Sequence, residues 1–178
     1  MPFTPLHMGP GVAIKAFAGR HFSLVAFGAA QVAIDIEPLV RMLRGDEVLH
    51  GPTHTYVGAL LIALALFPLV RVLYPALSRG WAVHGEQLAV LLPMPKQAPA
   101  LPVLAGLLVG TLSHVVLDNV MHADMHPFWP ESDDRFLYGW VDIDTLHLFC
   151  VLAGVVGLGA VVLRAVVSRR RDVGSWPR

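Results

Sequence analysis

The stretch LPVLAGLLVGTLSHVVLDNVM, residues 101–121, is apolar in its first half and polar in its last two turns. Its length matches the roughly 20 residues that a helix needs to cross a bilayer. With a period of 3.6, His114 and Asp118 fall at i and i+4 on one face, and His122 follows one turn later. Ionisable groups inside an apolar helix are costly and usually functional. The stretch therefore predicts a membrane-spanning helix with a polar site near one end.

The composition of the whole chain also indicates a membrane protein. Hydrophobic residues make up 55% of the 178 residues and charged residues only 15%, whereas soluble domains carry about 25% charged residues. The 13 basic and 13 acidic residues balance, which argues against nucleic acid as a partner. A single cysteine, Cys150, excludes an internal disulfide and a Cys-rich metal site.

Two further apolar runs, residues 53–77 and 145–167, are also long enough to span a membrane. The first apolar region is split into residues 9–19 and 22–34, each too short for a simple span. We interpret this pair as a helical hairpin that either spans or re-enters the membrane. A cleavable signal peptide is the alternative, because basic residues precede an apolar run that ends in small residues.

The predicted fold class is therefore all-α: a polytopic integral membrane helical bundle made of an N-terminal helical hairpin and three transmembrane helices. We expect one helical membrane domain over residues 1–167 and a basic tail over 168–178. In the last span, glycines 154, 157 and 159 are expected to allow close helix approach.

Arginines set the expected orientation. Arg169, Arg170 and Arg171 follow the last span, and Arg71 and Arg79 lie near the end of the second. The positive-inside rule puts both ends in the cytoplasm and the acidic 122–145 loop outside. Two arginines at 41 and 44 lie on the outer side in this topology and conflict with it mildly.

Polar residues collect where the predicted helices end at one membrane face. Each terminus there brings a histidine or a carboxylate, and random placement would spread such residues over both faces. The candidates for a shared site are His7, Asp35, Glu37, His50, His54, His114, Asp118, His122 and Asp124. Asp142, Asp144 and His147 precede the last span at the same face, and His147 is expected to be interfacial or solvated.

Imidazole and carboxylate groups without a thiolate suit zinc, manganese or iron. The HVVLD segment offers two ligands from one helical face, and HGPTH has the same spacing, although Gly51-Pro52 can break a helix there. We expect His7, Asp35, His50, His54, His114, Asp118 and His122 to bind a divalent metal, with zinc or manganese favoured and the number of ions open. Glu37 or Asp124 would take or orient the proton of a water.

Four segments together resemble one family: MPFTPLHMGPG (1–11), AIDIEPL (33–39), HGPTHT (50–55) and SHVVLDNVMHADMHPFWP (113–130). They are similar to the YdjM-like membrane-bound metal-dependent hydrolases of bacteria and archaea. The resemblance implies a multi-pass inner-membrane protein with a metal-assisted hydrolase site. The matching ligand positions are His7, Asp35, His50, His54, His114 and Asp118. One departure is Gly51, where the family pattern has an arginine.

The expected function is a membrane-embedded hydrolase with its site at the outer membrane face. Membrane lipids are the expected surroundings, and a small molecule or a lipid-like phosphoester is the expected substrate. A non-enzymatic metal-binding protein or a small metal transporter is the alternative. A transporter is expected to hold its ligands near the bilayer midplane, whereas the candidates here gather at one end.

Overall fold

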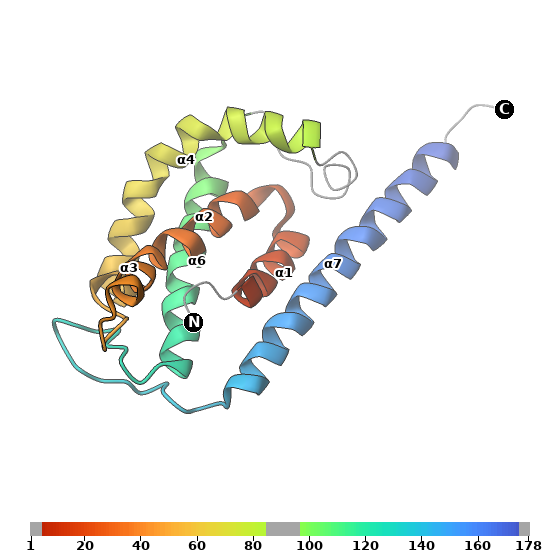
Figure 1. The fold of residues 1–178 in the computed structure, drawn as a ribbon. Coiled ribbons are helices and arrows are strands. Elements are labelled where there is room, and N and C mark those ends of the chain that lie inside the picture. Colours follow the sequence, from red (N-terminus) through yellow and green to blue (C-terminus); the bar gives the residue numbers. More distant parts are fainter. Residues whose placement is uncertain (1–4, 85–96, 175–178) are drawn as a thin grey trace.

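The computed structural model describes residues 5–84 and 97–174, and this part of the chain is built from helices joined by turns and loops (Figure 1). The predicted all-α fold is confirmed. In chain order the elements are η1 (Pro5–His7), α1 (Met8–Ala18), η2 (Gly19–His21), α2 (Leu24–Ile34), α3 (Ile36–Arg44), η3 (Pro52–His54), α4 (Tyr56–His84), α6 (Ala100–Met121) and α7 (Ile143–Gly174).

The N-terminal hairpin is formed by α1 and α2 with the η2 turn between them, as predicted. Each helix has 11 residues, or about 16 Å, roughly half the apolar core of a bilayer. Lys15 closes the turn by donating from Nζ to the carbonyls of Gly19 (2.9 Å) and Phe22 (2.8 Å). Ser23 caps α2, where its Oγ accepts from the Ala26 amide.

Three helices are long and apolar enough to cross a membrane: Tyr56–Arg79 in α4, Ala100–Met121, and Ile143–Val167 in α7. The first begins later than the sequence suggested, because Pro52–His54 forms a separate 3-10 turn and helical structure starts at Tyr56. α4 bends along its length (Figure 1), and it contains Pro68 and Pro75, which remove backbone donors inside a helix.

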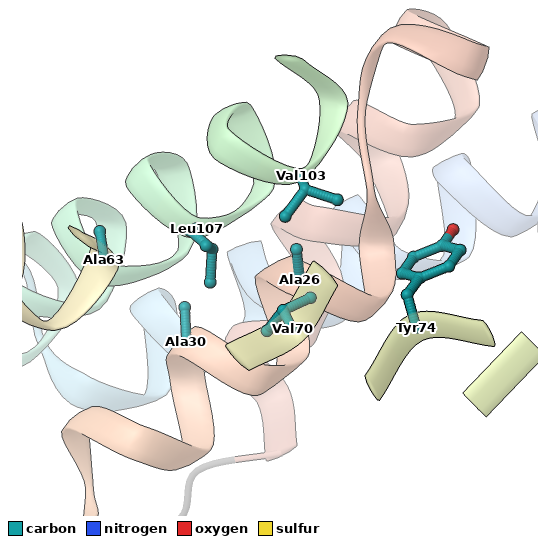
Figure 2. Packing of buried hydrophobic residues seen from close by; sticks show 7 residues of the cluster. All are labelled: Ala26, Ala30, Ala63, Val70, Tyr74, Val103 and Leu107. Carbon is teal, nitrogen blue, oxygen red and sulfur yellow. The ribbon is translucent and has the colours of Figure 1, made fainter. Parts of the chain in front are cut away.

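Helix α2 packs against both α6 and α4. Figure 2 shows the contact, in which Ala26 and Ala30 of α2 face residues of both long helices. The approach of α2 to α6 is close because α6 presents glycine there. A Cβ on Gly110 would lie 2.7 Å from the Cβ of Ala30 and 2.9 Å from the carbonyl oxygen of Phe27, so the helices could not approach as closely with a larger residue.

Helix α7 packs mainly against α1 (Figure 1). A Cβ on Gly157 would lie 2.6 Å from the Ala13 amide nitrogen, and Gly154 also faces α1 at Gly9. Both residues therefore act as predicted. Gly159 does not, because nothing lies within 4 Å of the place its Cβ would take.

Helix α7 also continues to Gly174, so residues 168–174 of the expected basic tail are helical. The domain division at 167 remains a prediction.

Candidate metal centre

Seven side chains that the sequence singled out as metal ligands come together near the C-terminal end of α6. They reach this place from η1, the α2–α3 junction, the loop before η3, η3 itself, and the end of α6. We call them the His/Asp cluster: His7, Asp35, His50, His54, His114, Asp118 and His122. All but His122 are buried, and His122 is half-buried. By the helical rise, His114 lies about 10 Å inside the end of α6.

Helix α6 supplies the centre of the cluster through the i, i+4 pair that the sequence predicted. His114 Nε2 lies 3.1 Å from Asp118 Oδ2 and 3.2 Å from Asp35 Oδ1. Asp35 is positioned by the junction between α2 and α3, where it ends one helix and begins the next. His54 Nε2 lies 3.4 Å from Asp118 Oδ2 and 3.8 Å from Asp35 Oδ1.

Two cluster histidines are held through Nδ1, so that Nε2 faces the carboxylates. His114 Nδ1 pairs with Gln31 Oε1 at 2.6 Å, and Gln31 Nε2 donates to the carbonyl of Gly110 at 3.1 Å. His54 Nδ1 lies 3.0 Å from the hydroxyl of Thr53. Metal-binding histidines are commonly oriented in this way by a partner on the other ring nitrogen.

His50 and His122 form the more open side of the cluster. Their rings lie 4.3 Å apart, and His50 Nε2 is 3.9 Å from Asp118 Oδ2. His50 Nδ1 pairs with Asp124 Oδ1 at 2.8 Å, while Asp124 Oδ2 accepts from the amides of Leu49 and His50. The HGPTH segment is not a helical pair, as Gly51-Pro52 breaks the helix, but the rings of His50 and His54 are still 4.8 Å apart.

His7 lies on the other side of Asp118, with Nδ1 3.8 Å from Oδ1. Its side chain is 1% exposed, and neither ring nitrogen has a hydrogen-bond partner within residues 5–84 and 97–174. Burial lowers the pKa of His7 to about 4, against the opposing pull of Asp118. A buried, neutral imidazole with two unused nitrogens suits metal binding, because such polar groups otherwise cost free energy.

Glu37 and Asp124, which were predicted to be catalytic, lie at the edge of the cluster. Asp124 contacts it directly, and Glu37 contacts it through Thr53. Glu37 Oε2 accepts from the amide (2.9 Å) and hydroxyl (2.5 Å) of Thr53, and its Oε1 pairs with Arg41 at 2.8 Å. Burial raises the pKa of Glu37, but these hydrogen bonds and Arg41 outweigh it and leave the pKa below its usual value. A role for either residue in proton transfer remains a prediction.

The environment also keeps Asp124 ionised and His50 neutral. Burial would raise the pKa of Asp124, yet the hydrogen bonds from His50 and the two backbone amides bring it to about 2. Burial lowers the pKa of His50, and the nearby His54 lowers it further. Asp124 raises the pKa but offsets only part of this shift. His50 therefore offers a neutral nitrogen that can bind a cation, and the Asp124 carboxylate holds its ring in place.

Two hollows share Arg41: one borders the cluster at His50, and the other includes Glu37 and Thr53 next to it. A pocket of about 370 Å³ is lined by His50, Gly51 and Trp129, among others. A groove of about 710 Å³ runs between α3 and α4 and includes Arg41, Arg44 and apolar residues of both helices. A Cβ on Gly51 would collide with Arg41 and with the Glu37 carboxylate. The Arg41 guanidinium therefore occupies the space next to this glycine.

Sequence reasoning missed Gln31, Thr53 and Arg41, which orient or border the cluster. Gln31 carried a usable signal: it is a polar residue in an apolar run, four positions before Asp35 and therefore on the same helical face. Asp142, which was expected at the same membrane face, caps α7 by accepting from the amide and hydroxyl of Thr145. Cys150 is a small buried core residue.

A family model described as YdjM inner membrane protein matches residues 11–175. The match begins inside α1, continues to the end of α7 and includes every residue of the His/Asp cluster except His7, which lies just before it. No curated protein matches the chain, and no solved structure matches it.

Proposed function

Because the chain belongs to the YdjM inner membrane protein family, we propose that it is a membrane-embedded hydrolase that uses a divalent cation held by the His/Asp cluster. The observation that carries this proposal is the arrangement of donors around Asp118. Nε2 atoms of His50, His54 and His114 all lie within 3.9 Å of Asp118 Oδ2. Histidines that point at one buried carboxylate in this way make a ready site for a cation.

The donor set fits a first-row divalent metal. It offers imidazole nitrogens and carboxylate oxygens, and Asp35, His54, His114 and Asp118 bring one ligand atom each within 4.8 Å of one another. Zinc or manganese is the cation we propose, since both accept this mixture of ligands. The negative charges of Asp35 and Asp118 would offset the charge of a dication inside a region that water reaches poorly.

A bound divalent cation supplies Lewis acidity: it activates water near neutral pH and neutralises charge that develops on a phosphoryl or carbonyl oxygen. The chain's own residues supply the positioning. Gln31, Thr53 and Asp124 hold three histidines with Nε2 towards Asp118. Asp124, ionised and close to the more open side, is the carboxylate that we propose to orient a water for attack.

The adjoining hollows support an anionic, amphiphilic substrate such as a lipid phosphoester. The pocket next to His50 and the groove between α3 and α4 both include Arg41, and arginine pairs well with phosphate oxygens. The groove also includes Ile62, Ala65 and Leu66 of the membrane-spanning α4, which suit an acyl chain. A headgroup beside Arg41 would thus lie between the lipid phase and the cluster.

Hydrolysis by protein purified in detergent tests this proposal. Phosphoester and carboxylic-ester substrates with acyl chains would be offered to the wild type with Zn²⁺ or Mn²⁺, and release of phosphate or acid would be measured. We expect turnover of an anionic phosphoester by the wild type and a loss of at least about 10²-fold in Asp118→Asn. His21→Ala, at an exposed position in η2, is the matched control and should retain full activity.

The non-enzymatic alternative predicts a different result. A metal transporter would carry Zn²⁺ or Mn²⁺ into liposomes that hold a metal-sensitive dye, and it would hydrolyse nothing. The cluster lies near one end of α6 rather than at its middle, which favours the enzyme. Metal transport without hydrolysis across the whole substrate panel would overturn the proposed function.

A further inference from the structure

The His/Asp cluster consists of two donor sets that overlap in one residue. Asp35, His54, His114 and Asp118 form the first set, and His50, Asp118 and His122 form the second. Within each set, the ligand atoms lie within 4.8 Å of one another. Asp118 is the only member that both sets contain. We call these the four-donor position and the three-donor position.

Each set is at most a few tenths of an ångström wider than a single ion allows. Zinc holds nitrogen and oxygen ligands at about 2.0–2.2 Å, so two ligand atoms on one ion are separated by at most about 4.4 Å. One ion at the four-donor position would leave the nitrogens of His50 and His122 without a cation. We propose that the cluster holds two divalent cations that share Asp118, an inference that rests on the metal-binding part of the proposed function.

Separate orienting contacts at the two positions support this division. At the four-donor position, Gln31 holds His114 and Thr53 holds His54. At the three-donor position, Asp124 holds the ring of His50 and also the backbone amides beside it. A second position with no ligand to bind would not need a partly buried carboxylate fixed by three hydrogen bonds.

The carboxylates and the unused donors support the same division. Asp35, Asp118 and Asp124 place three carboxylates in this region, and Asp124 borders the three-donor position through His50. Buried polar groups are rarely left without partners, so a cation at the three-donor position accounts for His50 and His122, which the first ion leaves without one.

The two positions differ in access. Side chains of the four-donor position are at most 6% exposed, and four protein ligands complete the coordination typical of closed sites. The three-donor position has fewer ligands, includes the half-buried His122, and borders the 370 Å³ pocket through His50. The cation there keeps a place for water or substrate, whereas the other is retained tightly and holds η3, α6 and the α2–α3 junction together.

Counting bound metal tests the inference without any substrate. Chelator-stripped protein in detergent would be loaded with Zn²⁺ or Mn²⁺ and passed through a desalting column, and metal would be measured per chain by mass spectrometry. We expect two ions in the wild type and in the His21→Ala control. His122→Ala should bind one ion, because His122 serves only the three-donor position, and its half-buried side chain can be shortened without opening a cavity in the core.

Asp124→Asn separates the positions by affinity. The second equivalent should bind about 10–100-fold more weakly than in the wild type, and the first should be unchanged. In wild-type protein loaded with Mn²⁺, paramagnetic resonance should show coupling between two ions, and His122→Ala should show the spectrum of an isolated ion. This second readout does not depend on recovery from the column.

The outcomes distinguish the two proposals. A wild type that retains one ion overturns the two-ion inference and leaves the metal-dependent hydrolase intact. A wild type that binds no Zn²⁺ or Mn²⁺ overturns both. Two ions that persist in His122→Ala, or that are both lost in it, contradict the assignment of ligands to the two positions.

Discussion

At the scale of single residues, the cluster depends on which ring nitrogen each histidine turns inward. A histidine can rotate and present either nitrogen, so a buried acceptor on one side decides what the other side can bind. Gln31 does this for His114 and also anchors itself to the Gly110 carbonyl. A residue outside the ligand set therefore controls its geometry.

Replacement of Gln31 by leucine should weaken metal binding by about 10–100-fold, because His114 loses the acceptor that fixes Nε2 towards Asp35 and Asp118. Competition with a chelator of known affinity measures the effect. Thr111→Val is the matched control. It removes a buried polar group from α6, the helix that carries His114, and the Thr111 hydroxyl donates only to backbone carbonyls. Equal affinities in Gln31→Leu and the wild type would show that Gln31 does not orient a ligand.

At the scale of elements, the cluster forms only because α2 approaches α6 closely. The glycine at 110 lets Ala30 and Phe27 come within contact distance of the α6 backbone. The same approach brings Gln31 within reach of α6, and it sets Asp35 opposite His114. The close packing of α2 against α6 therefore determines the geometry of the site.

Gly110→Ala should destabilise the protein by about 1–3 kcal/mol, since the added methyl would lie too close to Ala30 and must push α2 away. Metal affinity should fall in the same variant. Unfolding of detergent-solubilised protein by heat or by sodium dodecyl sulfate gives the change in stability. Gly159→Ala is the control, because its methyl would enter open space; a similar loss in both variants would contradict the role of close packing.

Much of this arrangement could be predicted from the sequence, and particular residues explain where prediction stopped. The length of the apolar runs gave the hairpin and the three long helices, and His114 with Asp118 marked the site. Helix α3 was missed because Pro38 and the arginines Arg41 and Arg44 interrupt the apolar pattern there. The contact of Gln31 with His114 was missed because a helix that is apolar all round does not reveal which face meets which neighbour, and Thr53 was missed because it lies in a short turn with no helical period.

At the scale of the whole molecule, large parts of α4 and α7 remain open to their surroundings. Residues such as Leu61, Leu64, Val72, Val155 and Leu163 are each at least 58% exposed, which suits helices that face lipid. Together with the family match, this agrees with an inner-membrane protein. The cluster then lies close to one membrane surface, and the charge distribution predicts that this surface is the outer one.

Cysteine labelling of intact cells tests that orientation. Asp133 is 83% exposed in the loop that follows α6, so Asp133→Cys in a Cys150→Ser background offers one accessible thiol. A membrane-impermeant reagent should label it without permeabilisation, because the acidic loop is expected outside and the arginines in the last turns of α7 inside. Labelling only after the membrane is opened would reverse the orientation and put the cluster at the cytoplasmic surface.

The central claim is that the cluster around Asp118 is a metal site. The most direct measurement is anomalous X-ray scattering from crystals of the wild type grown with Zn²⁺ or Mn²⁺, with data collected on both sides of the metal's absorption edge. An anomalous peak should lie among Asp35, His54, His114 and Asp118, and it should be absent in Asp118→Asn. Peaks found only elsewhere on the protein, with the cluster empty at saturating metal, would contradict the account.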